Sequence, residues 1–202
     1  MTKYSPLGTG HIGVKPATNL FHAARYASDT NRAPTVAVTI NWHRLDVPEE
    51  EASKLFRDMR RRVRRSWRHL VETDRGCGGL EDLGVHENPD GRRNTHWSVY
   101  VPAGERNQFE RIVTKFLSRV TGVSQLAGAL HFQSIYRHGL GSHMKYLTKG
   151  ISPEFASYFH MHAVDQGFVS GRGRTFVGRR IGLSARRAAG WTRKRRPKSP
   201  PT

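Results

Sequence analysis

The chain has 202 residues, of which 36% are hydrophobic, and its formal net charge at pH 7 is +18. This length suits one domain with polar extensions, and the low hydrophobic content argues against two separate cores. So positive a charge favours a polyanionic partner, with nucleic acid as the leading candidate, although a basic structural protein would have the same balance.

The two ends of the chain differ in composition from its middle. Residues 1–33 are polar and rich in Gly, Pro and Asn, which predicts a flexible N-terminal arm with a short helix near Asn19–Tyr26. From Ser170 onward there are eleven Lys and Arg residues and no acidic ones, which predicts a disordered basic tail over 169–202. The folded domain is therefore expected at 34–168.

Nothing in the sequence points to export or to a membrane. The N-terminal MTKYSPLGTGHIGVKP lacks an apolar leader, and no segment is long enough to span a bilayer. The single cysteine, Cys77, excludes an internal disulfide framework and a cysteine-rich zinc site. We therefore expect a cytoplasmic, soluble protein.

Hydrophobic periodicity alternates between strand and helix patterns along the domain. The predicted order is strand, helix, strand, strand, helix, strand and a further short helix. The strands are expected at 34–43, 80–87, 95–101 and 129–136, and the short helix at 141–150. The first helix would be capped by Asp46 and reach Leu70, and the second would follow Pro102 and reach Val120. This order predicts an α+β fold of the ferredoxin-like or split βαβ type (βαββαβ) with an antiparallel sheet. Both amphipathic helices would cover one face of the sheet, and the last helix would lie near the open face.

The open face is expected to carry polar residues, because strand residues alternate between faces. Imidazoles, carboxylates and amides gather there, and the candidate metal ligands are His43, His86, Glu87, Asn94, His96 and His131. Such donors suit a divalent cation. The competing interpretation is that His and Asn simply suit a solvated sheet face.

The last predicted helix contains KYLTK, in which Tyr146 and Lys149 lie three residues apart and so share a helix face. A tyrosine can act as a covalent nucleophile when a neighbouring cation activates it and offsets the developing charge. The alternative is ordinary packing of Tyr146.

With these motifs the chain resembles the HUH superfamily of single-strand DNA endonucleases, in particular rolling-circle replication initiators. The resemblance rests on NTHWSVYVP (94–102) and on KYLTKG (145–150), and the element order of 35–150 agrees with it. It implies that His96 is one histidine of the metal-binding pair, that Tyr146 forms a 5′-phosphotyrosine and that Lys149 assists. The implied cofactor is a divalent metal, Mg²⁺ or Mn²⁺. The family's first histidine is replaced by Asn94, a weaker ligand.

Two functions follow as expectations. The first is metal-dependent nicking and strand transfer of single-stranded origin DNA for a mobile element. Since no Walker-type motif is present, a host helicase and replication proteins would separate the strands. The second is non-catalytic nucleic-acid binding on the same scaffold. In both, the expected DNA contacts are basic: Arg57, Arg60, Arg61, Arg64, Arg65, Arg68, Lys145, Arg172, Arg174, Arg179, Arg180, Arg193, Lys194, Arg195 and Arg196.

Overall fold

The structure is a computed structural model that describes residues 8–72, 80–170 and 174–178. Its strands are β1 Gly8–Thr9, β2 Val36–Asn41, β3 Asp82–Glu87, β4 Asn94–Val99, β5 Leu130–Ser134, β6 Val169–Ser170 and β7 Thr175–Val177. Its α-helices are α1 Val14–Asp29, α2 Glu49–Glu72, α3 Arg106–Thr121, α4 Leu140–Leu147 and α5 Pro153–Ala156. Short 3-10 helices are η1 Trp42–Leu45, η2 Pro89–Gly91, η3 Arg137–Gly139 and η4 Ser157–Phe159.

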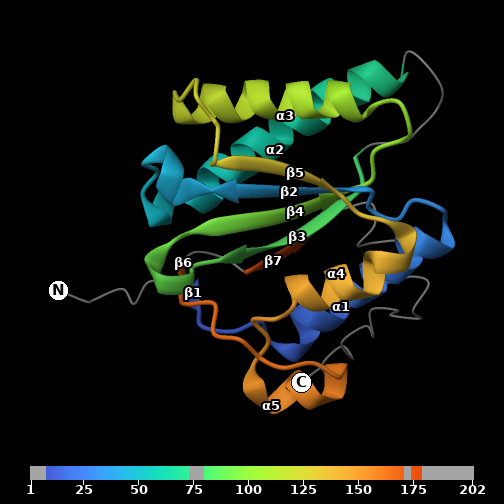
Figure 1. Cartoon of the computed structure of the whole chain (residues 1–202), viewed down its shortest axis with the longest axis vertical. Helices are drawn as coiled ribbons and strands as arrows, with labels where there is room; N and C mark the ends of the chain where they lie inside the picture. Colours follow the sequence, from blue (N-terminus) through green and yellow to red (C-terminus); the bar gives the residue numbers. More distant parts are fainter. Residues whose placement is uncertain (1–7, 73–79, 171–173, 179–202) are drawn as a thin grey trace, which may run out of the picture.

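Five of these strands form one antiparallel sheet in the order β5-β2-β4-β3-β7. The helices α2 and α3 lie side by side on one face of it, and α1 and α4 lie on the other (Figure 1). The predicted α+β class with an open antiparallel sheet is confirmed, and the strand order is compatible with a ferredoxin-like arrangement.

The main core fills the space between the sheet and the pair α2 and α3. As the alternation predicts, Val36, Val38 and Ile40 of β2 point into it and are buried. Trp97 of β4 packs against Phe56 of α2, with ring centroids 5.7 Å apart at 85°. Other fully covered members are Met59, Val63, Phe109, Val113 and Leu117. This core fixes the direction in which β2 and β4 present their remaining side chains.

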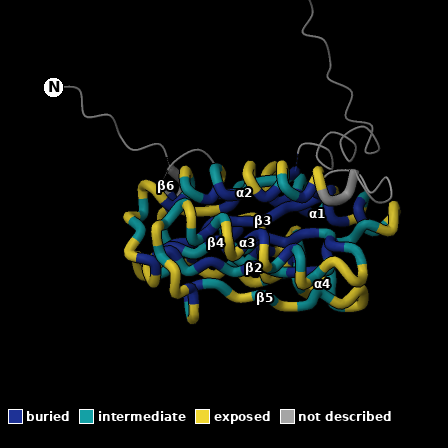
Figure 2. Tube along the Cα trace, turned by 90° about the horizontal axis from the view of Figure 1, so that it is seen from above, coloured by how far each residue is buried: buried dark blue, intermediate teal, exposed yellow. Residues whose placement is uncertain are grey.

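A second core lies on the opposite face of the sheet. There Leu20 of α1, Leu83 and Val85 of β3, and Met144 and Leu147 of α4 are buried together. All six residues of β3 are buried, as Figure 2 shows for the middle of the molecule, because helices cover both faces of the sheet there. The face that the sequence predicted to be open is thus covered along β3 and accessible nearer β2 and β5.

Two predictions about the chain ends need correction. The helix expected at Asn19–Tyr26 is the sixteen-residue α1, packed on the sheet, so most of the predicted flexible arm belongs to the folded structure. Likewise β7, within the predicted disordered tail, pairs with β3 at the sheet edge. The rest of that tail from residue 179, like 171–173, lies outside the described residues.

Candidate active site

The register of the sheet places polar side chains in rows on the face that α4 overlies. Directly paired residues of neighbouring strands point to the same face, so each row holds one residue from each strand. One row is Asn41, Asn94 and Glu87, and the next is His131, Thr39 and His96. A third consists of Gln133, Ala37 and Ser98. The site is therefore built on paired strands of the five-stranded sheet, with β2 and β4 inside it.

His96 lies at the centre of this surface and is held through both ring nitrogens. Its Nδ1 lies 3.1 Å from the Thr39 hydroxyl, and its Nε2 lies 3.1 Å from Oε2 of Glu87. An ionised carboxylate only accepts hydrogen bonds, so Nε2 carries the hydrogen and Thr39 donates to Nδ1 when the ring is neutral. The two contacts fix the ring plane and its tautomer.

Glu87 links His96 to Lys149. The Lys149 ammonium lies 3.3 Å from the same Oε2, and the Glu87 side chain is only 4% exposed. Burial alone raises the pKa of Glu87, but the hydrogen bond and charge of His96, with Lys149, outweigh it and bring the pKa below the usual value. The carboxylate is therefore ionised at neutral pH.

Tyr146 projects from the last turn of α4 towards His96. Its hydroxyl lies 3.5 Å from Nε2 of His96, at the outer limit of a hydrogen bond, and the two ring centroids are 5.2 Å apart. The Lys149 ammonium lies 4.0 Å from the centroid of the tyrosine ring. Tyr146 as a whole is 46% exposed, so the residue lies at the protein surface.

A second histidine, His143, was missed by the sequence reasoning. Its Nε2 lies 2.7 Å from the Ser98 hydroxyl of β4. Burial, together with the charge of His96, lowers the pKa of His143 to about 4, so the ring is neutral at physiological pH. Its position three residues before Tyr146 was the available signal, since both then share one face of α4.

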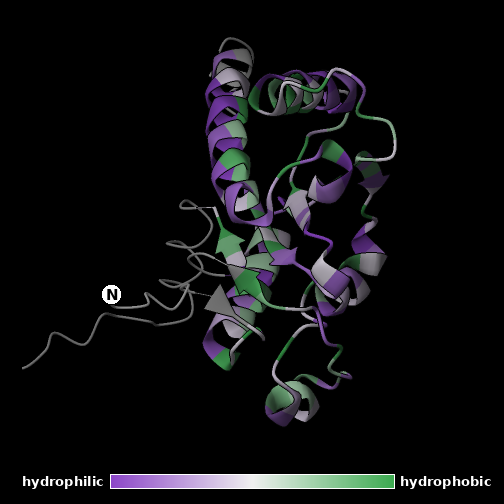
Figure 3. Ribbon diagram, turned by 90° about the vertical axis from the view of Figure 1, so that its left-hand side faces the viewer, coloured by the Kyte–Doolittle hydropathy of each residue, from purple (hydrophilic) through white to green (hydrophobic). Residues whose placement is uncertain are grey.

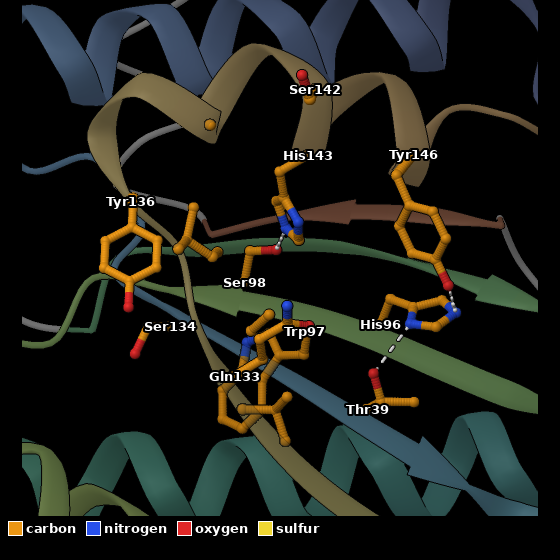
Figure 4. A pocket seen from close by; sticks show the side chains of 14 residues that line it. Thr39, His96, Trp97, Ser98, Gln133, Ser134, Tyr136, Ser142, His143 and Tyr146 are labelled. Atoms are coloured by element: carbon orange, nitrogen blue, oxygen red, sulfur yellow. Dashed lines mark hydrogen bonds between the residues drawn. The ribbon is translucent and has the colours of Figure 1, made fainter.

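These groups line a cavity of about 430 Å³ between α4 and the sheet (Figure 4). Tyr146 and His96 stand at one end, and Tyr136 and Ser134 stand at the other. Ala37 and Thr39 of β2 also line it. The nucleophile candidate thus adjoins a space that could receive part of a substrate.

Three histidines proposed as ligands lie away from His96. His86 points to the α2 face, where its Nδ1 lies 2.8 Å from the Thr95 hydroxyl and its ring packs on Phe56. Burial and neighbouring arginines lower the pKa of His86 well below its usual value, as suits a neutral core residue. His43 is exposed on η1 because β2 ends at Asn41, and His131 on the edge strand contacts the Gly128 carbonyl oxygen at 3.1 Å.

The remaining ligand candidates provide a partial donor set. Oε1 of Glu87 and Oδ1 of Asn94 are buried without a hydrogen-bond partner, and these residues are paired across β3 and β4. Oxygen donors of this kind suit Mg²⁺ or Mn²⁺. Over the residues that the structure describes, no three His, Cys, Asp or Glu side chains group closely enough to hold a metal. In the site proposed from these residues, the amide of Asn94 would be the third donor, beside Glu87 and His96.

The arginines of α2 divide into two kinds. Arg60 and Arg64 bind Asp82, a fully buried carboxylate on β3, and Trp97 donates to it at 2.8 Å. The other predicted contacts on this helix face solvent, and they are Arg57, Arg61, Arg65 and Arg68. All six line one shallow hollow on α2, the long helix that Figure 3 colours largely hydrophilic.

Other predicted DNA contacts have mixed positions. Arg174 is 3% exposed and donates to the carbonyl oxygens of Gln166 and Gly167, so it anchors that loop and is no surface contact. Lys145 is exposed and donates to the His160 carbonyl oxygen at 3.2 Å. The predicted contacts outside the described residues are Arg172, Arg179, Arg180, Arg193, Lys194, Arg195 and Arg196.

Comparison with known proteins gives no assignment, since no family model matches the chain and neither the curated proteins nor the solved structures contain a match. None of the helices within the described residues has the length and apolar character needed to cross a bilayer.

Proposed function

We propose that this protein nicks single-stranded DNA and joins itself to the 5′ end through Tyr146, as a rolling-circle replication initiator of the HUH type. The observation that carries the proposal is the position of Tyr146, whose hydroxyl lies 3.5 Å from Nε2 of His96 and whose ring centroid lies 4.0 Å from the Lys149 ammonium. On this view the sheet with α2 and α3 is the split βαβ scaffold of that superfamily. The site would act on origin DNA opened by a host helicase in the cytoplasm.

The reaction follows from the groups at hand. The Tyr146 oxygen attacks the scissile phosphorus, an O–P bond forms, and the bond from phosphorus to the 3′ oxygen breaks. The phenolic proton leaves to solvent, and the departing 3′ oxygen takes a proton from water. Lys149 stabilises the phenolate through its charge, and Glu87 holds Lys149 in place from the other side.

A divalent cation fits the donor set formed by His96, Oε1 of Glu87 and Oδ1 of Asn94. When bound, it would polarise the scissile phosphate and offset the charge that develops on it. To bind a cation through Nε2, His96 would carry its hydrogen on Nδ1 and donate it to the Thr39 hydroxyl, and Nε2 would give up its hydrogen bond to Glu87.

One observation favours the non-catalytic alternative. Asn94 replaces an imidazole with a neutral amide, and Lys149 already partners one oxygen of Glu87. A site weakened in this way would still bind single-stranded DNA through the basic surface without cleaving it. Adduct formation separates the two functions.

The test uses the full-length protein, Mn²⁺ and a randomised single-stranded 30-mer labelled with fluorescein at its 3′ end. Because the tyrosine takes the 5′ phosphate, the label should migrate with the protein on a denaturing gel. Tyr146→Phe should abolish this adduct, and so should EDTA. Tyr158→Phe is the matched control, since Tyr158 is 73% exposed on η4 and does not line the cavity.

Each outcome decides something. An adduct that persists in Tyr146→Phe removes Tyr146 from the mechanism. If the wild-type protein binds the library but forms no adduct at any Mn²⁺ concentration, the non-catalytic function stands in place of nicking.

A further inference from the structure

The cavity beside Tyr146 has no charged lining, although the protein as a whole is strongly basic. Its walls contain no Lys, Arg, Asp or Glu among the described residues, and the histidines that reach it are His96 and His143. Lys149 and Glu87 lie outside this lining, and Arg106 of α3 donates a hydrogen bond to Ser134 at its edge. A space of this kind is poorly suited to a phosphate and well suited to a neutral, polar ring.

The side chains at the far end of the cavity have the chemistry that recognises such a ring. Tyr136 is 66% exposed, and its ring stacks on His138 with a centroid separation of 5.7 Å and an interplanar angle of 11°. Gln133 projects from β5 on the same face as Ala37 and presents both an amide donor and a carbonyl acceptor. Proteins hold unstacked bases by stacking on aromatic rings and by hydrogen bonds to base edges.

The floor of the cavity is formed by a small residue. Ala37 stands between Gln133 and Ser98 in its row across the sheet, where larger neighbours flank it. The volume of about 430 Å³ falls within the usual range for small-ligand sites. Since Ala37 adds no polar group, filling this position changes the space and leaves the hydrogen-bonding groups unchanged.

We propose that this cavity holds one nucleobase of the single-stranded substrate, adjacent to the phosphate at Tyr146, with Tyr136 as the stacking surface and Gln133 as the reader of the base edge. The proposal rests on the proposed function for its substrate class. It adds a source of sequence selectivity that the phosphate-directed groups lack, because backbone contacts carry no sequence information.

The proposal is tested by selection with a non-cleaving protein. Full-length Tyr146→Phe is incubated with a randomised single-stranded 12-mer library, and the bound fraction is sequenced. One position should show a preference for a single base of about tenfold, the size expected for one good polar pair with a base. Adding Gln133→Ala should reduce that preference to below twofold, and Ala37→Leu should do the same by filling the floor.

The controls separate this proposal from folding and from nicking. Asn107→Ala removes an exposed amide from α3 and should leave the base preference unchanged. Sequencing the adducts of the wild-type protein should place the preferred base next to the joined phosphate. A preference without adducts would refute nicking and retain the base site. A flat profile, or one that survives both Gln133→Ala and Ala37→Leu, would overturn the base site whatever the adduct assay gives.

Discussion

At the scale of single residues, His96 is the organising group of the site. Thr39 and Glu87 hold its two nitrogens, and Glu87 in turn holds Lys149. Such a chain leaves neither the imidazole nor the ammonium free to rotate away, so both stay beside Tyr146 without help from a ligand. Preorganisation of this kind lowers the cost of assembling charges around a transition state.

Asn94 gives a direct test of the metal-binding arrangement. Asn94→His would place a second imidazole two residues from His96 on the same face of β4, and an imidazole nitrogen is a more basic donor than an amide oxygen. We expect the Mn²⁺ concentration for half-maximal adduct formation to fall by about tenfold. An unchanged midpoint would mean that position 94 does not contact the cation.

His143 predicts a dependence of stability on pH. Its folded pKa of about 4 lies below the ordinary histidine value of 6.5, so the unfolded chain takes up a proton first as the pH falls. The neutral ring contributes its full stabilisation to the fold above pH 6.5, and this contribution is lost as the pH falls towards 4. The free energy of unfolding should fall by about 2 kcal/mol over this range, a value reduced for the partial exposure of the ring. His143→Gln should reduce the difference in urea unfolding free energy between pH 7 and 4.5. His138 is exposed, so His138→Gln should keep the wild-type difference. If the wild type and both variants lose the same unfolding free energy between pH 7 and 4.5, His143 is not the source of the pH dependence.

At the scale of elements, β3 and α2 are joined by Asp82. Burial raises the pKa of this carboxyl, but Arg60 and Arg64 outweigh burial and hold the pKa below 3.8. The stabilisation is therefore present above about pH 4 and is lost as the pH falls through the folded pKa. Asp82→Asn should lower the free energy of unfolding at pH 7 by about 3 kcal/mol, because it leaves two arginines without their partner. Arg61→Ala, on the exposed side of α2, should change it by less than about 0.5 kcal/mol.

The helix α1 makes a separate prediction about the N-terminal segment. Leu20 is fully buried against the sheet, so Leu20→Ala should cost about 3 kcal/mol in urea unfolding. Lys15→Ala, at an exposed position of the same helix, should have almost no effect. A flexible arm would instead make the two substitutions equally harmless.

The same helix shows where the sequence stops being informative. The faces of β2 and β4 could be predicted because Val36, Val38, Ile40 and Trp97 alternate with polar residues. The buried positions of α1 are mostly alanines, Leu20 excepted, and its N-cap is Gly13 without a side-chain cap. A stripe of methyl groups gives little hydrophobic periodicity, so a long packed helix looked like a polar arm.

The site divides in a similar way. The structure brings His96, Glu87, Tyr146 and Lys149 together, as the pattern predicted. His86 could have been excluded beforehand, because neighbours on a strand face opposite sides and Glu87 already takes the site face. The hydrogen bond between His143 and Ser98 and the cavity below α4 could not be predicted from the sequence. Both depend on the strand register and on where α4 packs against the sheet.

At the scale of the whole molecule, the sheet separates two surfaces of different chemistry. The Tyr146 site and its cavity lie on the α4 face, and the arginine cluster of Arg57, Arg61, Arg65 and Arg68 belongs to α2 on the opposite face. A bound strand long enough to reach both would be held by charge on one side and positioned for reaction on the other. Substitutions on α2 should therefore change the affinity for DNA, and substitutions beside Tyr146 should change the rate of adduct formation.

The salt dependence of DNA binding shows whether the strand contacts the arginines of α2 or responds only to the net charge of the protein. Replacing Arg61, Arg65 and Arg68 with Gln removes three charges from α2, and each lost phosphate contact should reduce the slope of log K against log salt by about 0.7 for single-stranded DNA. We expect a total reduction of about 2, measured by fluorescence anisotropy of a 30-mer between 50 and 300 mM NaCl. The matched control removes three exposed charges from α3, namely Arg111, Lys115 and Arg119. If that control reduces the slope equally, binding follows the overall field of the +18 protein, and α2 has no special part in it.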